Sequence, residues 1–130
     1  MAIALGIFLI LHGFVHLLYA GHCRRLYSLS PGLQWPDGSW GLSRLLGNDA
    51  TRTVVAALLL LAALGFAAGG LGLLIGLEAW RPVIVVASVF SSLLYIALWD
   101  GTGRALSGQG VFGLLINLAV LAVLLVLKWP

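Results

Sequence analysis

The chain has 130 residues, of which 62% are hydrophobic and 8% are charged, and its formal net charge is +3. A soluble domain carries about 25% charged residues, so the composition excludes a soluble globular protein. It also excludes a disordered chain, and the single cysteine, Cys23, excludes an intrachain disulfide scaffold. We therefore expect one integral membrane domain over residues 1–130.

Four apolar stretches have the length needed to cross a membrane. A transmembrane helix takes about 20 residues to cross roughly 30 Å of hydrocarbon, and none of the stretches alternates as a membrane β-strand does. The predicted helices span residues 2–20, 53–77, 82–99 and 109–127. Short connections join the last three, which makes neighbouring helices antiparallel. The predicted fold is therefore all-α, an antiparallel bundle of four transmembrane helices.

A long first loop, residues 21–52, separates the first predicted helix from the second. It contains the sequence WPDGSW, with Trp35 and Trp40 at its two ends. Tryptophan is enriched where the hydrocarbon meets the lipid headgroups. We therefore expect this loop to lie in the interfacial region, with both tryptophans as anchors.

The basic residues are distributed unequally between the two sides that four spans define. The first and third loops share one side, and the second loop and both termini share the other. The first side has five basic residues and the second has two: Arg24, Arg25, Arg44, Arg52 and Arg104 against Arg81 and Lys128. The positive-inside rule then predicts a multi-pass protein of the cell (inner) membrane, with the long first loop in the cytoplasm and both termini outside. The spread of these charges indicates the lipid bilayer as a partner and no nucleic acid.

Polar residues inside the predicted spans are the candidate functional residues, because each needs a partner or a watery cavity. His12 and His16 are four residues apart and share one face of the first helix. The third helix carries a stripe of hydrogen-bonding side chains, and the fourth carries Asn117 on the face of two glycines. The stripe consists of Ser88, Ser91, Ser92, Tyr95 and Trp99.

Three of these residues are predicted to lie at one depth in the membrane. His12 is eight residues before Ala20, Ser92 eight before Asp100, and Asn117 eight after Gln109. At about 1.5 Å per residue, all three lie roughly 12 Å in from the same side. We therefore predict one polar layer shared by three helices, with His16 and Tyr95 one turn nearer the loops and Asp100 near the mouth. The candidate ligand-binding residues are His12, His16, Ser92, Tyr95, Asn117 and Asp100.

The two histidines admit three interpretations. They are neutral imidazoles hydrogen-bonded to Ser92, Tyr95 or Asn117, or they contribute to a binding site, or they hold a metal ion. A zinc ion wants further ligands, and the nearest carboxylates are predicted to lie too close to the surface to reach His12. The metal and any cofactor are therefore left unassigned, with His12 and His16 as the metal ligands if there is one.

Two glycine pairs mark the second predicted helix as a packing helix. Gly65 and Gly69 are four residues apart, as are Gly72 and Gly76. Small residues at this spacing let helices approach closely in membranes. The pairs pack either inside the bundle or against a second copy of the chain, and the sequence leaves both open. In the second case, Gly69→Leu is expected to change the assembled mass.

Several short elements resemble those of small, uncharacterised bacterial four-helix integral membrane proteins. They are HGFVH at residues 12–16, WPDGSW at 35–40, WDG at 99–101 and GLLINLAVL at 113–121. In size and architecture the chain is also similar, more coarsely, to DoxX-like proteins. The resemblance implies a four-helix membrane fold and no particular activity.

The sequence contains packing motifs and interfacial residues but no complete catalytic constellation. The leading hypothesis is a non-enzymatic accessory or assembly subunit, working as a homo-oligomer or within a larger membrane complex. The alternative is a bundle that binds a lipid-soluble ligand, a quinone or a tetrapyrrole, at the polar layer. An enzyme with His12 and His16 as metal ligands is the third hypothesis.

Overall fold

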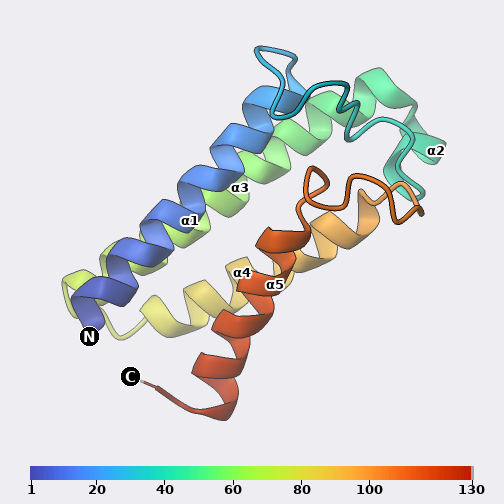
Figure 1. Cartoon of the computed structure of the whole chain (residues 1–130). Helices are drawn as coiled ribbons and strands as arrows, with labels where there is room; N and C mark the ends of the chain where they lie inside the picture. Colours follow the sequence, from blue (N-terminus) through green and yellow to red (C-terminus); the bar gives the residue numbers. More distant parts are fainter. Residues whose placement is uncertain (130) are drawn as a thin grey trace.

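The computed structural model describes residues 1–129, and within them the regular structure is entirely helical (Figure 1). The helices are α1 (Ala2–Cys23), α2 (Leu42–Leu46), α3 (Asn48–Leu74), α4 (Trp80–Ala97) and α5 (Val111–Leu121), and the π-helical segment η1 (Ala122–Val126) continues α5. Three of them, α1, α3 and α4, are long and apolar enough to cross a membrane, and Val111–Val126 forms a shorter apolar helix. The all-α class is confirmed, and the chain is a helical membrane protein.

The helix boundaries correct the predicted spans at several ends. The second predicted helix, 53–77, begins earlier, at Asn48, and ends at Leu74. Hydropathy marks only the part of a helix that lies in hydrocarbon, so it misses the polar start of α3, which contains Asp49 and Arg52. At the other end the residues remain apolar, but Gly76 has a φ of +74°, which ends the helix despite its hydropathy. The loop predicted over 21–52 is correspondingly shorter and contains α2.

The first, third and fourth predicted helices also differ from the structure at their ends. α1 runs to Cys23, beyond the predicted end at residue 20. α4 covers 80–97 where 82–99 was predicted, and Pro82 lies in its first turn, where proline is tolerated. α5 begins at Val111, because the preceding Gly110 adopts a left-handed conformation with a φ of +88°.

The long helices pack one against the next in chain order, and this row curves so that its first and last helices face each other. α1 lies along α3, α3 packs against α4, and α4 packs against α5. Over the described residues, α1 and α5 approach each other only sparsely (Figure 1). The arrangement therefore has one open side, between α1 and α5, where the row does not close into a tight bundle.

The glycines of α3 pack inside the chain. A Cβ atom added at Gly69 would lie 2.4 Å from Cδ1 of Ile84 on α4, and one at Gly65 would lie 3.1 Å from Cβ of Ala87. Gly70 faces α1, where an added Cβ would lie 2.8 Å from the backbone oxygen of Gly6. The first glycine pair thus brings α3 close to α4 in the same chain. Of the second pair, Gly72 faces Trp80, whose Cβ would lie 3.2 Å from an added Cβ, and Gly76 lies beyond the end of the helix with no neighbour in reach among residues 1–129.

The first loop packs against the end of α4. Trp35 is only 3% exposed, and its Nε1–H donates to the Leu98 carbonyl at 3.1 Å. The Trp40 indole donates to the Ile96 carbonyl at 2.7 Å. The last carbonyls of a helix have no partner within the helix, so the two tryptophans cap α4. The interpretation of Trp35 as a membrane anchor is therefore wrong, since its ring is buried in the protein.

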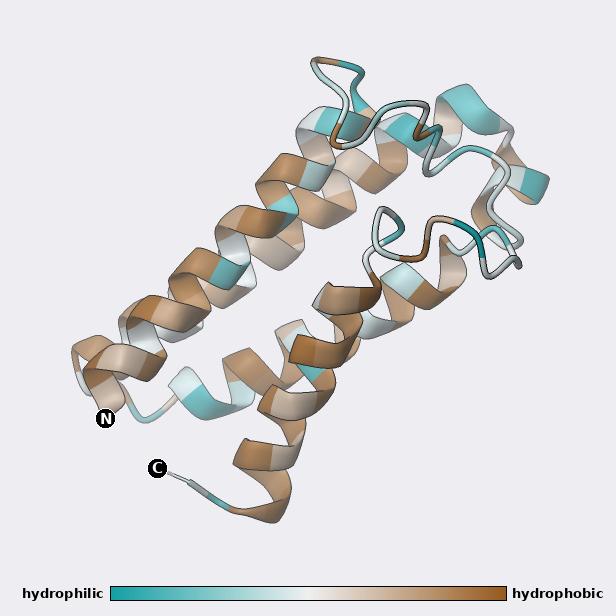
Figure 2. Ribbon diagram, viewed as in Figure 1, coloured by the Kyte–Doolittle hydropathy of each residue, from teal (hydrophilic) through white to brown (hydrophobic). Residues whose placement is uncertain are grey.

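The outer faces of the long helices are apolar, and the polar residues gather mainly in the loops (Figure 2). Large exposed hydrophobic side chains occur along α1, α3, α4 and α5. Such a surface suits contact with lipid chains. The orientation of the chain in a membrane, and whether α5 also crosses it, stay predictions.

Candidate functional site

Four polar side chains from three helices form a hydrogen-bonded cluster in the interior. His12 Nε2 lies 2.8 Å from Oδ1 of Asn117, and Asn117 Nδ2 donates to Oγ of Ser91 at 2.9 Å. Ser91 Oγ lies 2.7 Å from His16 Nε2, and His16 Nδ1 lies 3.0 Å from the backbone oxygen of His12. His12 is 4% exposed and the other three side chains are fully buried. We call these four residues the polar cluster.

The donors and acceptors of the polar cluster fit two neutral histidines. The Asn117 oxygen needs a donor, so His12 carries its proton on Nε2. The His12 carbonyl needs a donor, so His16 carries a proton on Nδ1, and its Nε2 accepts from the Ser91 hydroxyl. With the Asn117 amide reversed, His16 would need protons on both ring nitrogens. A buried charge without a countercharge is costly, so the neutral arrangement is the stable one.

Aromatic rings enclose the histidines. The Phe66 ring of α3 stacks on His16 with centroids 5.2 Å apart and meets His12 edge-on at 4.7 Å. Both nitrogens of His16 are engaged in hydrogen bonds, so neither has a free lone pair for a metal ion in this arrangement. Within residues 1–129, no group of three or more His, Cys, Asp or Glu side chains is placed to hold a metal ion.

The structure brings together only part of the predicted layer. His12 and Asn117 meet directly, as the depth estimate predicts. Ser92 does not join them, because its hydroxyl donates to the backbone oxygen of Ser88 at 2.7 Å. Asp100 lies in the loop after α4, where its carboxylate accepts hydrogen bonds from the Thr102 backbone and hydroxyl at 2.8 and 2.9 Å. The partner of His16 is Ser91, not the predicted Ser92 or Tyr95.

Sequence reasoning missed Ser91 and Phe66 as neighbours of the histidines. Ser91 belongs to the predicted stripe, but a rotation of α4 by one residue decides whether Ser91 or Ser92 faces α1. Phe66 gives no signal of its own, because a phenylalanine in an apolar helix faces lipid as readily as protein. The one available hint is its position on the same helix face as Ala62 and Gly69, which are buried.

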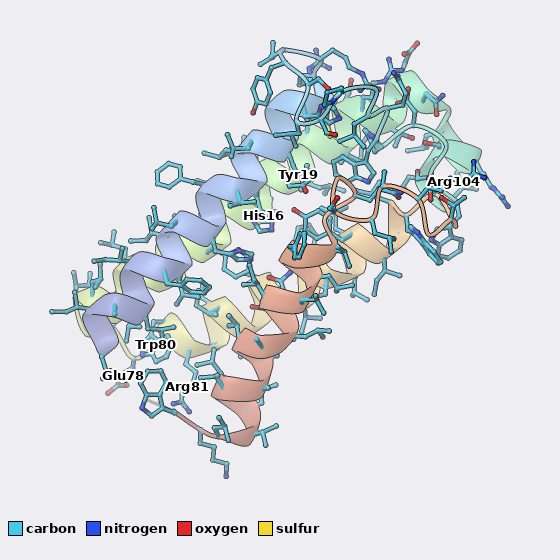
Figure 3. The ribbon with its side chains drawn as sticks, in the orientation of Figure 1. His16, Tyr19, Glu78, Trp80, Arg81 and Arg104 are labelled. Atoms are coloured by element: carbon cyan, nitrogen blue, oxygen red, sulfur yellow. The ribbon has the colours of Figure 1, made fainter. Side chains whose placement is uncertain are left out.

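The open side between α1 and α5 has an apolar cleft of about 200 Å³ next to the polar cluster. Its walls include Leu5, Phe8 and Leu9 on α1, Ile116 and Val120 on α5, and Leu124 on η1. The Phe8 ring lies parallel to the His12 ring with centroids 6.2 Å apart, so the cleft adjoins the cluster at His12. Further along α1, His16 and Tyr19 also point towards the α5 side (Figure 3).

An ion-pair network fixes the first loop at the end of the bundle. Arg52 Nε donates to Oδ1 of Asp37 at 2.7 Å and its Nη2 pairs with Oδ2, while Arg25 Nη2 lies 3.1 Å from the same Oδ2. The hydrogen bond from Arg52 holds the pKa of Asp37 below its usual value. Asp37 therefore ties α3 and the end of α1 to the loop that caps α4.

This network is expected to weaken in acid. Because the pKa of Asp37 is lower in the folded protein, its stabilising effect is complete above the unfolded value of about 3.9 and is lost as the pH falls through the folded pKa. Asp37→Asn should cost about 1 kcal/mol at neutral pH, since both arginines are partly exposed and solvent screens the pairs. Thermal unfolding of wild type and Asp37→Asn in mild detergent, between pH 7 and pH 3, measures this difference in stability. The difference between wild type and variant should shrink towards pH 3, and a difference that stays constant would contradict the assignment.

Comparison with known protein families, curated proteins and solved structures finds no match.

Proposed function

We propose that the protein binds a neutral, lipid-soluble molecule within the membrane, at the polar cluster. The observation that carries the proposal is the position of that cluster on the open side of the helix row, next to an apolar cleft. A small-molecule site is usually apolar with a few convergent polar groups. His12 and Asn117 supply those groups, and the cleft between α1 and α5 supplies the apolar wall.

The cluster and the cleft restrict the ligand. The cluster contains no Asp, Glu, Lys or Arg, so a charged head would lack a countercharge in a low-dielectric environment. A cleft of about 200 Å³ is small beside the roughly 300–1,000 Å³ of ordinary ligand pockets, so it suits a chain and not a broad macrocycle. This favours a quinone-like molecule over a tetrapyrrole.

A partner helix fits the open side poorly. The hydrogen bond from His12 to Asn117 crosses that side at 2.8 Å, whereas a helix with its side chains is about 10–12 Å wide. A single flexible chain is narrow enough to lie beside this bridge, in the cleft between α1 and α5. The occupant proposed here is therefore a small molecule.

Native mass spectrometry on protein released gently from its own membrane tests the proposal. We expect multiples of the 13.7 kDa chain plus a bound mass of roughly a few hundred daltons. Ala119→Trp, in the wall of the cleft, should abolish the extra mass, and Ala122→Trp, exposed and outside the wall, should keep it. Wild-type protein without extra mass, or an Ala119→Trp variant that retains it, would refute the proposal.

The accessory-subunit hypothesis stays a prediction that the same spectrum tests. An added mass equal to a whole polypeptide would identify a partner subunit, and multiples of the chain alone would identify a homo-oligomer. The packing of Gly65 and Gly69 against α4 removes one argument for a homo-oligomer, because these glycines are already in contact within the chain.

We also propose four membrane spans, with the loops after α1 and α4 in the cytoplasm. The support is the apolar helix Val111–Val126 and the excess of arginine in those loops. A reporter enzyme fused to the C-terminus should be active only on the outer side. Activity on the cytoplasmic side would mean an odd number of spans or the opposite orientation.

A further inference from the structure

The Tyr95 hydroxyl is a buried group without a hydrogen-bond partner in the described part of the chain. Tyr95 is 3% exposed, and its hydroxyl meets no acceptor or donor among residues 1–129. An unpaired buried polar group costs about 1–3 kcal/mol, so such a group needs an explanation. Ser88 Oγ is also unpaired, but a serine in a helix can turn to the carbonyl four residues back. A tyrosine hydroxyl cannot.

The ring of Tyr95 is held so that it cannot turn to another partner. It lies against Gly110, which precedes α5, and Gly113 on α5: an added Cβ at Gly110 would overlap the ring, and one at Gly113 would be 3.1 Å from it. Tyr19 meets it edge-on at 5.7 Å, and the His16 ring centroid is 5.8 Å away. The glycines are needed for this fit, and the hydroxyl stays fixed in place beside the polar cluster.

The hydroxyl extends the polar cluster by one helical turn towards the loops. It lies near Gly113, where an added Cβ would be 3.7 Å from the oxygen, and Gly113 is four residues before Asn117 on α5. One turn of helix is about 5.4 Å. His12 Nε2–H, at the level of Asn117, and Tyr95 O–H are therefore two donors offset by about one turn along α5. Two donors at different levels suit a flat ring that carries an oxygen at each of two opposed positions.

Resting on the proposed function, we infer that the ligand is a neutral ring with two opposed carbonyl oxygens and an apolar chain. Tyr95 O–H donates to one oxygen and His12 Nε2–H donates to the other, in place of the Asn117 oxygen. The chain lies in the cleft between α1 and α5. Binding opens the bridge between His12 and Asn117: the ligand carbonyl replaces the acceptor that His12 loses, and the Asn117 oxygen gives up its donor.

A fatty acid and a sterol fit the same groups less well. A carboxylate needs a countercharge that the cluster lacks. A fused-ring sterol is broad and rigid, whereas the cleft holds about 200 Å³. The side chains around Tyr95 are aromatic, with Tyr19 and Trp35 at centroid distances of 5.7 and 6.2 Å. Such surroundings favour a flat ring.

Two probes and two variants test the inference. The probes are benzoquinone with a decyl chain and decylbenzene, which has the same chain without oxygens, titrated into the protein in mild detergent and followed by native mass spectrometry. We expect Tyr95→Phe to weaken quinone binding about tenfold, which is 1.4 kcal/mol. Tyr19→Phe, the matched control, removes a hydroxyl that already donates to the Ser107 carbonyl, and should leave quinone binding unchanged. Decylbenzene should bind more weakly than the quinone, and equally to wild type and to Tyr95→Phe.

The outcomes separate this inference from the proposed function. Equal quinone binding by wild type and Tyr95→Phe, in a protein that carries a bound molecule from its membrane, would overturn the role of Tyr95 and leave the proposed function standing. Failure of wild type to take up either probe or to carry any bound molecule would overturn both. The ligand-free Tyr95→Phe variant should melt no lower than wild type, because its missing hydroxyl has no partner in the protein. A lower melting temperature would mean that the hydroxyl is bonded internally, and would also overturn the inference.

Discussion

Replacing Gly70 by leucine is expected to destabilise the protein more than any other single change in α3. An added Cβ at this position would lie 2.8 Å from the Gly6 carbonyl oxygen, and 2.9 and 3.2 Å from Cγ1 and the backbone nitrogen of Ile10. Two of these three atoms belong to the backbone of α1, so the strain cannot be relieved by a side-chain rotation. The two helices must separate along their contact, which costs about 3 kcal/mol or more.

Thermal unfolding in mild detergent, followed by circular dichroism, measures this effect. Ala68→Leu is the matched control, because Ala68 lies on the exposed face of the same helix, two residues away. The control should have the melting temperature of wild type, and Gly70→Leu should have a far lower one. A Gly70→Leu variant as stable as the control would mean that α1 and α3 are not packed as closely as the structure places them.

The helical class was predictable because hydrocarbon leaves the chain few alternatives. A long apolar stretch in a membrane must satisfy its backbone internally, so it forms a helix whatever its detailed sequence. The ends were less predictable, because a helix can continue into polar residues, as α3 does from Asn48 to Arg52. It can also end within apolar ones, as at Ile75 and Gly76, where a left-handed glycine decides.

Contacts between helices were predictable only where the spacing and depth of residues along a single helix determine them. The spacing of His12 and His16 and the depth of Asn117 correctly indicated that polar groups from α1 and α5 would meet. The choice of Ser91 over Ser92 depends on the rotation of α4, which is set by its packing against α3 at Gly65 and Gly69. No local pattern contains that information.

The open side between α1 and α5 could not be predicted from the sequence, for a related reason. Four apolar helices with short connections fit a closed bundle as well as an open row. Trp35 shows the same limit, since a tryptophan in a loop reads as an interfacial anchor until the loop is seen to fold over the end of α4. Tertiary contacts decide both cases, and the candidate site depends on both.

Replacing Asn117 by leucine is expected to be the most damaging change within the polar cluster. It leaves the His12 Nε2–H without an acceptor and removes the donor to Ser91, in a buried environment without bulk water. Each buried group left unpaired costs about 1–3 kcal/mol. Ser92→Ala is the matched control, because Ser92 bonds only to the backbone of its own helix, and it should change stability little.

A double-mutant cycle then isolates the bond that crosses the open side. His12→Leu and Asn117→Leu should each destabilise the protein, and the double variant should be more stable than the sum of the two effects predicts, because no unpaired partner remains. Couplings of this kind in membrane proteins average about 0.6 kcal/mol and reach about 1.7. A value in the upper half of that range is expected here, since both groups are buried and the bond is 2.8 Å long. Strict additivity would mean that His12 and Asn117 are not bonded, and that the open side is wider than the structure shows.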